Sequence, residues 1–101
     1  MKQYQHETII IAQDAWKFMW NFERERHGFK AISDEQLNKI WAKISDFRNG
    51  GANPKTHPIS ENEIRITKDT FNLRWDEVKE IIMNSNFSHR QDGFVAEGAY
   101  M

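Results

Sequence analysis

Hydrophobic residues in the first quarter of the chain recur at spacings that predict a long helix over residues 7–27. At about 100° per residue, the apolar side chains between Ile9 and Phe22 fall within an arc of about 200°, roughly twice the width expected of a helix that covers one core face. Gly28 is placed to end the helix. Such a face fits either a helix through the middle of the domain or one that packs against a second copy of the chain. The residues expected at such a homodimer interface are Ile9, Trp16 and Trp20.

A second helix is predicted over residues 33–48. Ser33 and Gln36 have the spacing of a capping box, in which each side chain bonds to the backbone N–H of the other. Apolar residues then recur at helical spacing at Leu37, Ile40, Trp41, Ile44 and Phe47. Residues 48–58 contain two glycines and two prolines, which predict an irregular connection.

Residues 63–67 can be read in two ways. Ile64 and Ile66 alternate with polar residues, as in a half-buried strand, whereas Ser60 and Glu63 have the spacing that caps a short helix. Beyond them, Trp75, Val78, Ile81 and Ile82 share one face of an amphipathic helix. Asp92 and Gly93 then form a strong turn dipeptide between apolar residues, which predicts a β-hairpin.

This order of elements over residues 59–97 resembles that of winged helix-turn-helix DNA-binding domains. The resemblance is carried by a turn residue at Asn72, an apolar residue at Leu73, and buried positions at Val78 and Ile81. It implies a single domain over residues 1–101 that is mainly α, with a long N-terminal helix and a small C-terminal β-hairpin. In that family the second helix of the motif enters the major groove and reads base edges.

The resemblance implies a DNA-binding regulatory protein whose reading helix contributes Arg74 and Lys79 and whose wing contributes His89 and Arg90. Positive side chains earlier in the chain are expected to contact the phosphate backbone. Those residues are Lys39, Lys43, Arg48 and Lys55.

Charge supports a second hypothesis of equal weight. The chain has a net charge of −1, and residues 59–101 carry five Lys or Arg against eight Asp or Glu. Carboxylates on the expected reading helix oppose binding to phosphates. The chain is therefore alternatively a protein-interaction module, an inhibitor or adaptor that meets a basic partner. Its binding face would consist of Asp76, Glu77 and Glu80.

Composition narrows the remaining possibilities. The chain has no cysteine, which excludes disulfides and thiolate chemistry and fits a cytoplasmic protein. The longest apolar run is far shorter than the roughly 20 residues of a membrane-spanning helix, so no membrane partner is expected. Four dispersed histidines and the lack of catalytic or nucleotide-binding motifs predict a non-enzymatic protein without metal or cofactor, although a small nuclease or toxin stays open. The alternating charges of residues 23–26 are expected to form a solvated helix face.

Overall fold

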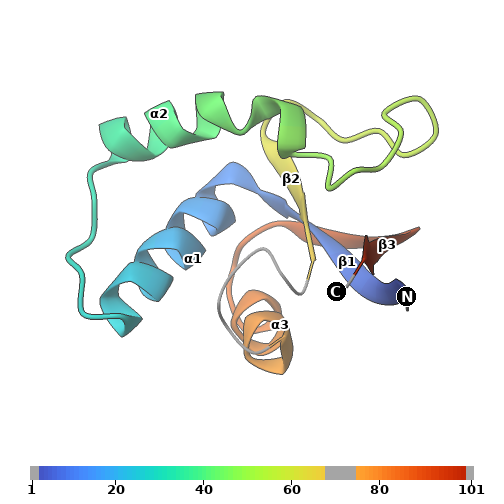
Figure 1. The fold of residues 1–101 in the computed structure, drawn as a ribbon. Helices are drawn as coiled ribbons and strands as arrows, with labels where there is room; N and C mark the ends of the chain where they lie inside the picture. The colour runs from blue at the N-terminus through green and yellow to red at the C-terminus, as the bar shows by residue number, and fades with distance from the viewer. Residues whose placement is uncertain (1–2, 68–74, 100–101) are drawn as a thin grey trace.

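The computed structural model describes residues 3–67 and 75–99, in which three α-helices accompany a three-stranded antiparallel sheet (Figure 1). The elements in chain order are β1 (Gln3–Ala12), α1 (Gln13–Arg26), α2 (Asp34–Lys43), the 3-10 turn η1 (Ser45–Phe47), β2 (Glu63–Ile66), α3 (Trp75–Met83) and β3 (His89–Ala99).

Strand β1 is the centre of the sheet, with β2 on one side and β3 on the other. Three consecutive isoleucines, Ile9 to Ile11, lie near its C-terminal end, and branching at Cβ favours the extended backbone of a strand. Ile9 pairs with Ile66 and Ile11 with Ile64, while Ile10 lies opposite Arg65. All three isoleucines are fully buried, so both faces of this strand are covered.

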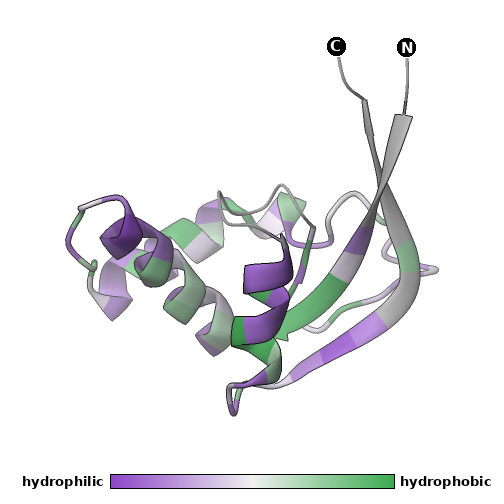
Figure 2. Ribbon diagram, turned by 90° about the horizontal axis from the view of Figure 1, so that it is seen from below, coloured by the Kyte–Doolittle hydropathy of each residue, from purple (hydrophilic) through white to green (hydrophobic). Residues whose placement is uncertain are grey.

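The main core lies on the face of the sheet that carries Ile9 and Ile11. Ala15, Trp16 and Met19 of α1 pack there. The cluster is completed by one residue of α2 and two each of β2 and α3: Leu37, Ile64, Ile66, Val78 and Ile82. Figure 2 shows the hydrophobic residues, in green, gathered where helices and sheet meet. Because successive side chains of a strand point to opposite faces, Ile10 belongs to the other side of the sheet.

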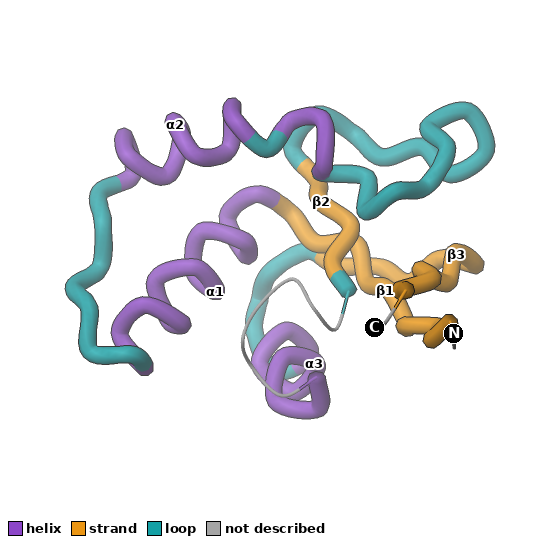
Figure 3. The backbone as a smooth tube through the Cα atoms, in the orientation of Figure 1, coloured by secondary structure: helices purple, strands orange, loops and turns teal. Residues whose placement is uncertain are grey.

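Residues 48–60, the covering loop, close this second face and are part of the long connection between η1 and β2 (Figure 3). Buried Arg65 of β2 holds the loop: its guanidinium donates to the carbonyl oxygens of Asn49 at 3.0 Å and His57 at 3.4 Å. The Arg65 backbone N–H donates to the carbonyl of Arg48 at 2.7 Å, so the loop also bonds to the outer edge of β2. Arginine is normally exposed to solvent, but here the buried Arg65 side chain is the centre of the contacts between the sheet and the covering loop.

The predicted helix over residues 7–27 is wrong in its first part. Residues up to Ala12 belong to β1, and the helix begins at Gln13. The 200° arc arises because it combines the apolar residues of a strand buried on both faces with those of a helix. A short continuous apolar run does not distinguish a buried strand from a buried helix by its period.

The predicted C-terminal hairpin is also wrong, and with it the mainly α fold. Asp92 and Gly93 lie inside the continuous strand β3, whose partner is β1. Glu7 pairs with Val95 and Ile9 with Gln91, so residues 92–94 lie opposite Thr8 alone. The turn dipeptide therefore forms a bulge. Within it, the Thr8 hydroxyl donates to the carbonyl of Phe94 at 2.7 Å.

One local prediction is confirmed, and one open question is settled. Both bonds of the capping box between Ser33 and Gln36 are present at the start of α2, although that helix ends at Lys43 and continues only as the η1 turn. Residues 63–66, for which the sequence leaves both strand and helix open, form a strand. The turn of the proposed helix-turn-helix, with Asn72, Leu73 and Arg74, lies outside the described residues.

Candidate binding site

Three of the positive residues expected to bind DNA are engaged within the molecule. Nη1 of Arg48 donates to the carbonyl oxygens of Glu61 at 2.6 Å and Glu63 at 3.0 Å. Lys79 forms an ion pair with Glu7 at 3.4 Å, and Arg90 forms one with Glu63 at 3.2 Å. These contacts connect the covering loop to β2, α3 to β1, and β3 to β2.

The other expected DNA contacts are spread over several elements. Lys39 and Lys43 are exposed on α2, with the Lys39 amine 3.9 Å from the Glu35 carboxylate, and Lys55 is exposed in the covering loop. The ring of His89, at the start of β3, lies 3.1 Å from the Phe87 carbonyl. Arg74 is outside the described residues.

The ion pairs change the ionisation of their carboxylates. Hydrogen bonds from Arg90 hold the pKa of Glu63 below its ordinary value, and bonds from Ser60 act in the same direction against the effect of burial. A hydrogen bond from the Trp75 indole lowers the pKa of Glu7, with Lys79 contributing in the same sense. Both carboxylates therefore stay charged and paired at neutral pH.

The acidic residues of the alternative hypothesis all lie on α3, but they differ in surroundings. The Asp76 side chain is 86% exposed and lies 3.8 Å from Lys79. Glu77 forms an ion pair with Arg26 of α1, and Glu80 is exposed. Arg26 and Lys79 offset much of the negative charge of this face.

Two of the three residues expected at a dimer interface lie inside the molecule. Ile9 and Trp16 are fully buried in the main core. Trp20 is partly buried, packs against that core, and has its ring centroid 5.3 Å from that of Trp16. Ile9 and Trp16 offer no surface to a second copy, because the sheet and helices of the same chain already cover them.

The C-terminal end of α1 forms a pocket by purely local means. Gly28 has a φ of +85°, and its N–H donates to the carbonyl of Glu25 at 3.0 Å, while that of Phe29 donates to the carbonyl of Arg24 at 2.9 Å. This pair of bonds is the Schellman motif, which folds the residue after the glycine back onto the last helical turn. Phe29 consequently lies over Arg24, whose guanidinium carbon is 5.5 Å from the ring centroid. Trp20 is one turn earlier on the same face of the helix.

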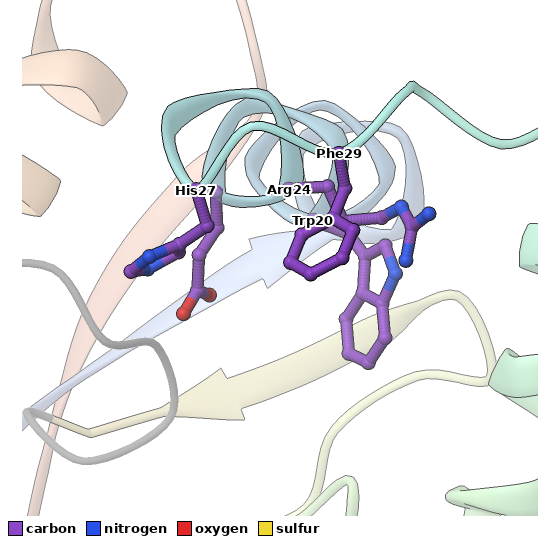
Figure 4. A pocket seen from close by; sticks show the side chains of 5 residues that line it. Trp20, Arg24, His27 and Phe29 are labelled. Atoms are coloured by element: carbon purple, nitrogen blue, oxygen red, sulfur yellow. The ribbon is translucent and has the colours of Figure 1, made fainter.

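We call this cavity the Trp20 pocket. It has a volume of about 340 Å³ and is lined by Trp20, Glu23, Arg24, His27 and Phe29. Figure 4 shows the Phe29 and Trp20 rings together on one side and His27 on the other. The Phe29 side chain is among the most exposed large hydrophobic residues described, at 61%. The pocket thus combines two flat rings with three ionisable groups.

One hydrogen-bond donor of this pocket lacks an acceptor among the described residues. The indole Nε1 of Trp20 is shielded from solvent and has no partner there. Nε of Arg24, in the same lining, donates to the carbonyl of Lys30 at 2.9 Å. A shielded donor without a partner costs about 1–3 kcal/mol.

The glycine turn that shapes this pocket can be recognised in the sequence, but the alternating charges of residues 23–26 predict only a solvated helix face. The prediction that Gly28 ends the helix is confirmed, whereas the solvated face predicted for residues 23–26 is only part of the arrangement. Of these residues, Glu23 and Arg24 line the pocket and Arg26 pairs with Glu77. A bulky aromatic residue directly after a glycine C′ position indicates a side chain that folds back, and Phe29 satisfies that rule.

Other kinds of site find little basis in residues 3–67 and 75–99. No group of three or more His, Asp or Glu side chains there could hold a metal ion. Within the same residues, no helix combines the length and the apolar character needed to cross a membrane.

Comparison of the chain with models of protein families, with curated proteins and with solved structures finds no match.

Proposed function

We propose that this protein is a non-enzymatic binding module that recognises its ligand by taking a flat ring into the Trp20 pocket. One observation carries the proposal: the Schellman motif at Gly28 holds the exposed Phe29 ring over Arg24, beside an indole N–H without an acceptor among the described residues. Small-molecule sites are typically concave and aromatic, with a few polar groups that fix orientation. The volume of about 340 Å³ lies near the lower end of their usual range.

The energy of burying apolar surface supports binding at this pocket. Phe29 is an exposed residue, and each Å² of apolar area that a ring stacked on it removes from water contributes roughly 25 cal/mol. Aromatic pairs gain about 0.5–1.5 kcal/mol beyond this. The pocket wall is also ordered before binding, because the helix end, its glycine turn and the bond from Arg24 to Lys30 hold it in place.

The two functions expected from the sequence have weaker support. Binding to duplex DNA calls for a set of free cations, whereas Arg48, Lys79 and Arg90 are engaged in internal contacts. Binding of a basic protein partner calls for an acidic face, whereas positive side chains neutralise part of α3. Asp76 and Glu80 are the exposed acidic residues of α3 that such a partner would contact.

The test uses ¹⁵N-labelled full-length protein and two flat probes, indole and benzamide. The four tryptophans give four indole N–H signals, and that of Trp20 is assigned by its loss in Trp20→Phe. We expect both probes to shift the Trp20 signal in a saturable way. Phe29→Ala should weaken binding, because it removes one stacking surface without disturbing the core.

Phe47→Ala is the matched control. Phe47 is also a highly exposed phenylalanine, at 76%, and it lies outside the Trp20 pocket. If neither probe moves the Trp20 signal, or if the two alanine variants weaken binding equally, the proposal is wrong.

A further inference from the structure

We infer that this protein has a second binding surface, a groove beside Phe18 that takes a short, positively charged amphipathic helix of a partner protein. The groove lies between α1 and the connection that leads to α2 (Figure 1), and it has a volume of about 380 Å³. We call it the Phe18 groove. Phe18, Phe22, Ile32 and Leu37 supply its apolar lining, and it shares no residue with the Trp20 pocket. Because Phe18 and Trp20 are two residues apart on one helix, the two sites lie on roughly opposite sides of α1.

Internal contacts hold both walls of the Phe18 groove in place. The side-chain N–H of Asn21 on α1 donates to the carbonyl of Ile32 at 3.2 Å, and the side-chain oxygen of Asn21 accepts from the N–H of Ile32 at 2.9 Å. At one end of the groove, Lys17 of α1 forms an ion pair with Asp34 of α2 at 2.6 Å. Because the groove is formed before a partner arrives, binding costs little ordering of the protein.

Aromatic rings extend the groove into a longer exposed strip. Phe18 is 46% exposed although its side chain is apolar. Its ring centroid lies 6.1 Å from that of Phe22, in a stacked arrangement, and 5.4 Å from that of Phe87, which precedes β3. Three rings in a row form a surface longer than a single flat ligand covers. An amphipathic helix, whose apolar side chains recur every three or four residues along one face, fits such a strip.

The charges of the groove favour a positively charged helix. Lys17 and Asp34 are paired with each other, so Glu25 is the remaining charged residue of the lining. Glu25 is exposed and has no ion-pair partner among the described residues. It belongs to the last turn of α1, where the aligned peptide dipoles add a partial negative charge. An anionic segment is repelled there, and a Lys or Arg side chain is attracted.

The positive side chains next to Glu25 in the sequence are engaged elsewhere. Arg26 forms an ion pair with Glu77 of α3, and Nε of Arg24 donates to the carbonyl of Lys30. Adjacent residues of a helix do not face each other, so neither arginine lies over the Glu25 carboxylate. Glu25 is therefore the acidic contact that a positive side chain of the partner meets.

The spacing of residues along α1 sets the pattern of the partner helix. Phe18 and Glu25 are seven residues apart, which corresponds to about two helical turns or roughly 10 Å. A partner helix that lies along α1 therefore carries an apolar anchor and a Lys or Arg at the same separation. A second apolar residue one turn from the anchor completes its contact with the aromatic strip.

The experiment titrates ¹⁵N-labelled full-length protein with two alanine-based peptides of about 18 residues, a length at which such peptides form helices in water. Both peptides carry the same apolar anchors, and the position about two turns from the first anchor holds lysine in one peptide and glutamate in the other. We expect the lysine peptide to shift the backbone N–H signals of Phe18, Phe22 and Ile32 in a saturable way. The glutamate peptide should bind about 2- to 5-fold more weakly at low salt, and the difference should shrink at high salt. Equal binding of the two peptides at low salt, or no binding of either at millimolar concentration, would overturn the inference.

Variants connect the binding to named side chains. Phe18→Ala should weaken binding of the lysine peptide by about 10-fold or more, whereas Phe47→Ala, which alters an exposed phenylalanine outside the groove, should leave it unchanged. Glu25→Gln should make the two peptides bind alike, and Glu80→Gln, at an exposed carboxylate of α3, should preserve the difference. Because Glu25 is exposed, its variant tests the inference even if Phe18→Ala lowers stability. A preference for lysine that survives Glu25→Gln would contradict the role given to that carboxylate.

A second copy of this chain is the other occupant that the measurements distinguish. If sedimentation of the protein alone shows a dimer that Phe18→Ala abolishes, the groove binds a second copy and the inference is wrong; a monomer supports a separate partner. The Trp20 indole signal should not move in the peptide titration. If the peptides shift that signal and leave those of Phe18 and Phe22 unchanged, they bind at the Trp20 pocket and the inference fails. Indole and benzamide test that pocket separately, so each proposal can fail while the other stands.

Discussion

Replacing the buried Arg65 by methionine is the most informative single change for the architecture. The side chain is only 2% exposed and lies between the sheet and the covering loop. Its guanidinium donates to the carbonyl and side-chain oxygens of Asn49 and to the carbonyl of His57, and it lies 5.3 Å from the centroid of the Phe94 ring. Methionine has a similar length and no donors, so the change removes these bonds with little change in volume.

The expected loss can be worked out from those contacts. Each hydrogen bond from a charged donor contributes about 1.5–3 kcal/mol, and the two to Asn49 are the shorter ones. The cation–π contact adds about 1–2 kcal/mol in a desolvated setting. Relief from burying a charge offsets part of this sum. We therefore expect Arg65→Met to lower the free energy of unfolding by about 3–5 kcal/mol, a large share of the roughly 5–15 kcal/mol typical of a domain.

Urea unfolding followed by circular dichroism measures this loss. With an m-value of about 2 kcal/mol/M, the midpoint should fall by roughly 2 M. Lys55→Met in the covering loop is the control, because Lys55 is exposed and should change stability by less than about 0.5 kcal/mol. If Arg65→Met is as stable as the unchanged protein, or more stable, desolvation of the guanidinium outweighs its hydrogen bonds and our account of the second face fails.

Three further changes test smaller parts of the structure. Gly28→Ala places a side chain at a φ of +85° and should cost about 1–2 kcal/mol of stability in thermal or urea unfolding; an unchanged midpoint would argue against the Schellman turn. Ser33→Ala removes the oxygen that accepts from the N–H of Gln36, so we expect a loss of about 1 kcal/mol by the same measurement and no effect on ligand binding. The ion pair between Glu63 and Arg90 depresses the pKa of Glu63, so its stabilising effect is fully present above the ordinary pKa of glutamate and is lost as pH falls through the lower, folded-state value. NMR titration of the Glu63 carboxyl should show this low pKa, and Arg90→Gln should raise it; an identical titration curve in both proteins would refute the pairing.

A feature of this fold could be predicted from the sequence when the interactions that produce it lie within a few neighbouring residues. The capping box at Ser33 and the glycine stop at Gly28 are interactions within a few residues, and both are present. The strand nature of Ile9 to Ile11 depends on pairing with residues near the other end of the chain, such as Arg90 opposite Ile10. No period within a short window contains that information, so the apolar pattern predicts a helix where the fold has its first strand.

The candidate site shows the same division. The fold-back of Phe29 onto Arg24 is a consequence of local sequence and could have been predicted from the glycine turn. The use of Arg48 and Arg90 as internal contacts could not, because their partners Glu61 and Glu63 are held near them only by the completed sheet and covering loop. The sequence alone does not show whether a charged side chain will form an ion pair or hydrogen bond within the fold.

The pairing of β1 with β3 has a mechanical consequence. Gln3 lies opposite Ala99 in an antiparallel ladder, so the outer ends of the two strands are neighbours. A force that pulled these two ends apart would break the hydrogen bonds between β1 and β3 one after another, rather than loading all of them together in shear. The bulge at Thr8 would be the first irregular rung that such a force meets before it reaches the fully buried isoleucines. Force applied at these ends should therefore separate β1 from β3 before it disrupts the core.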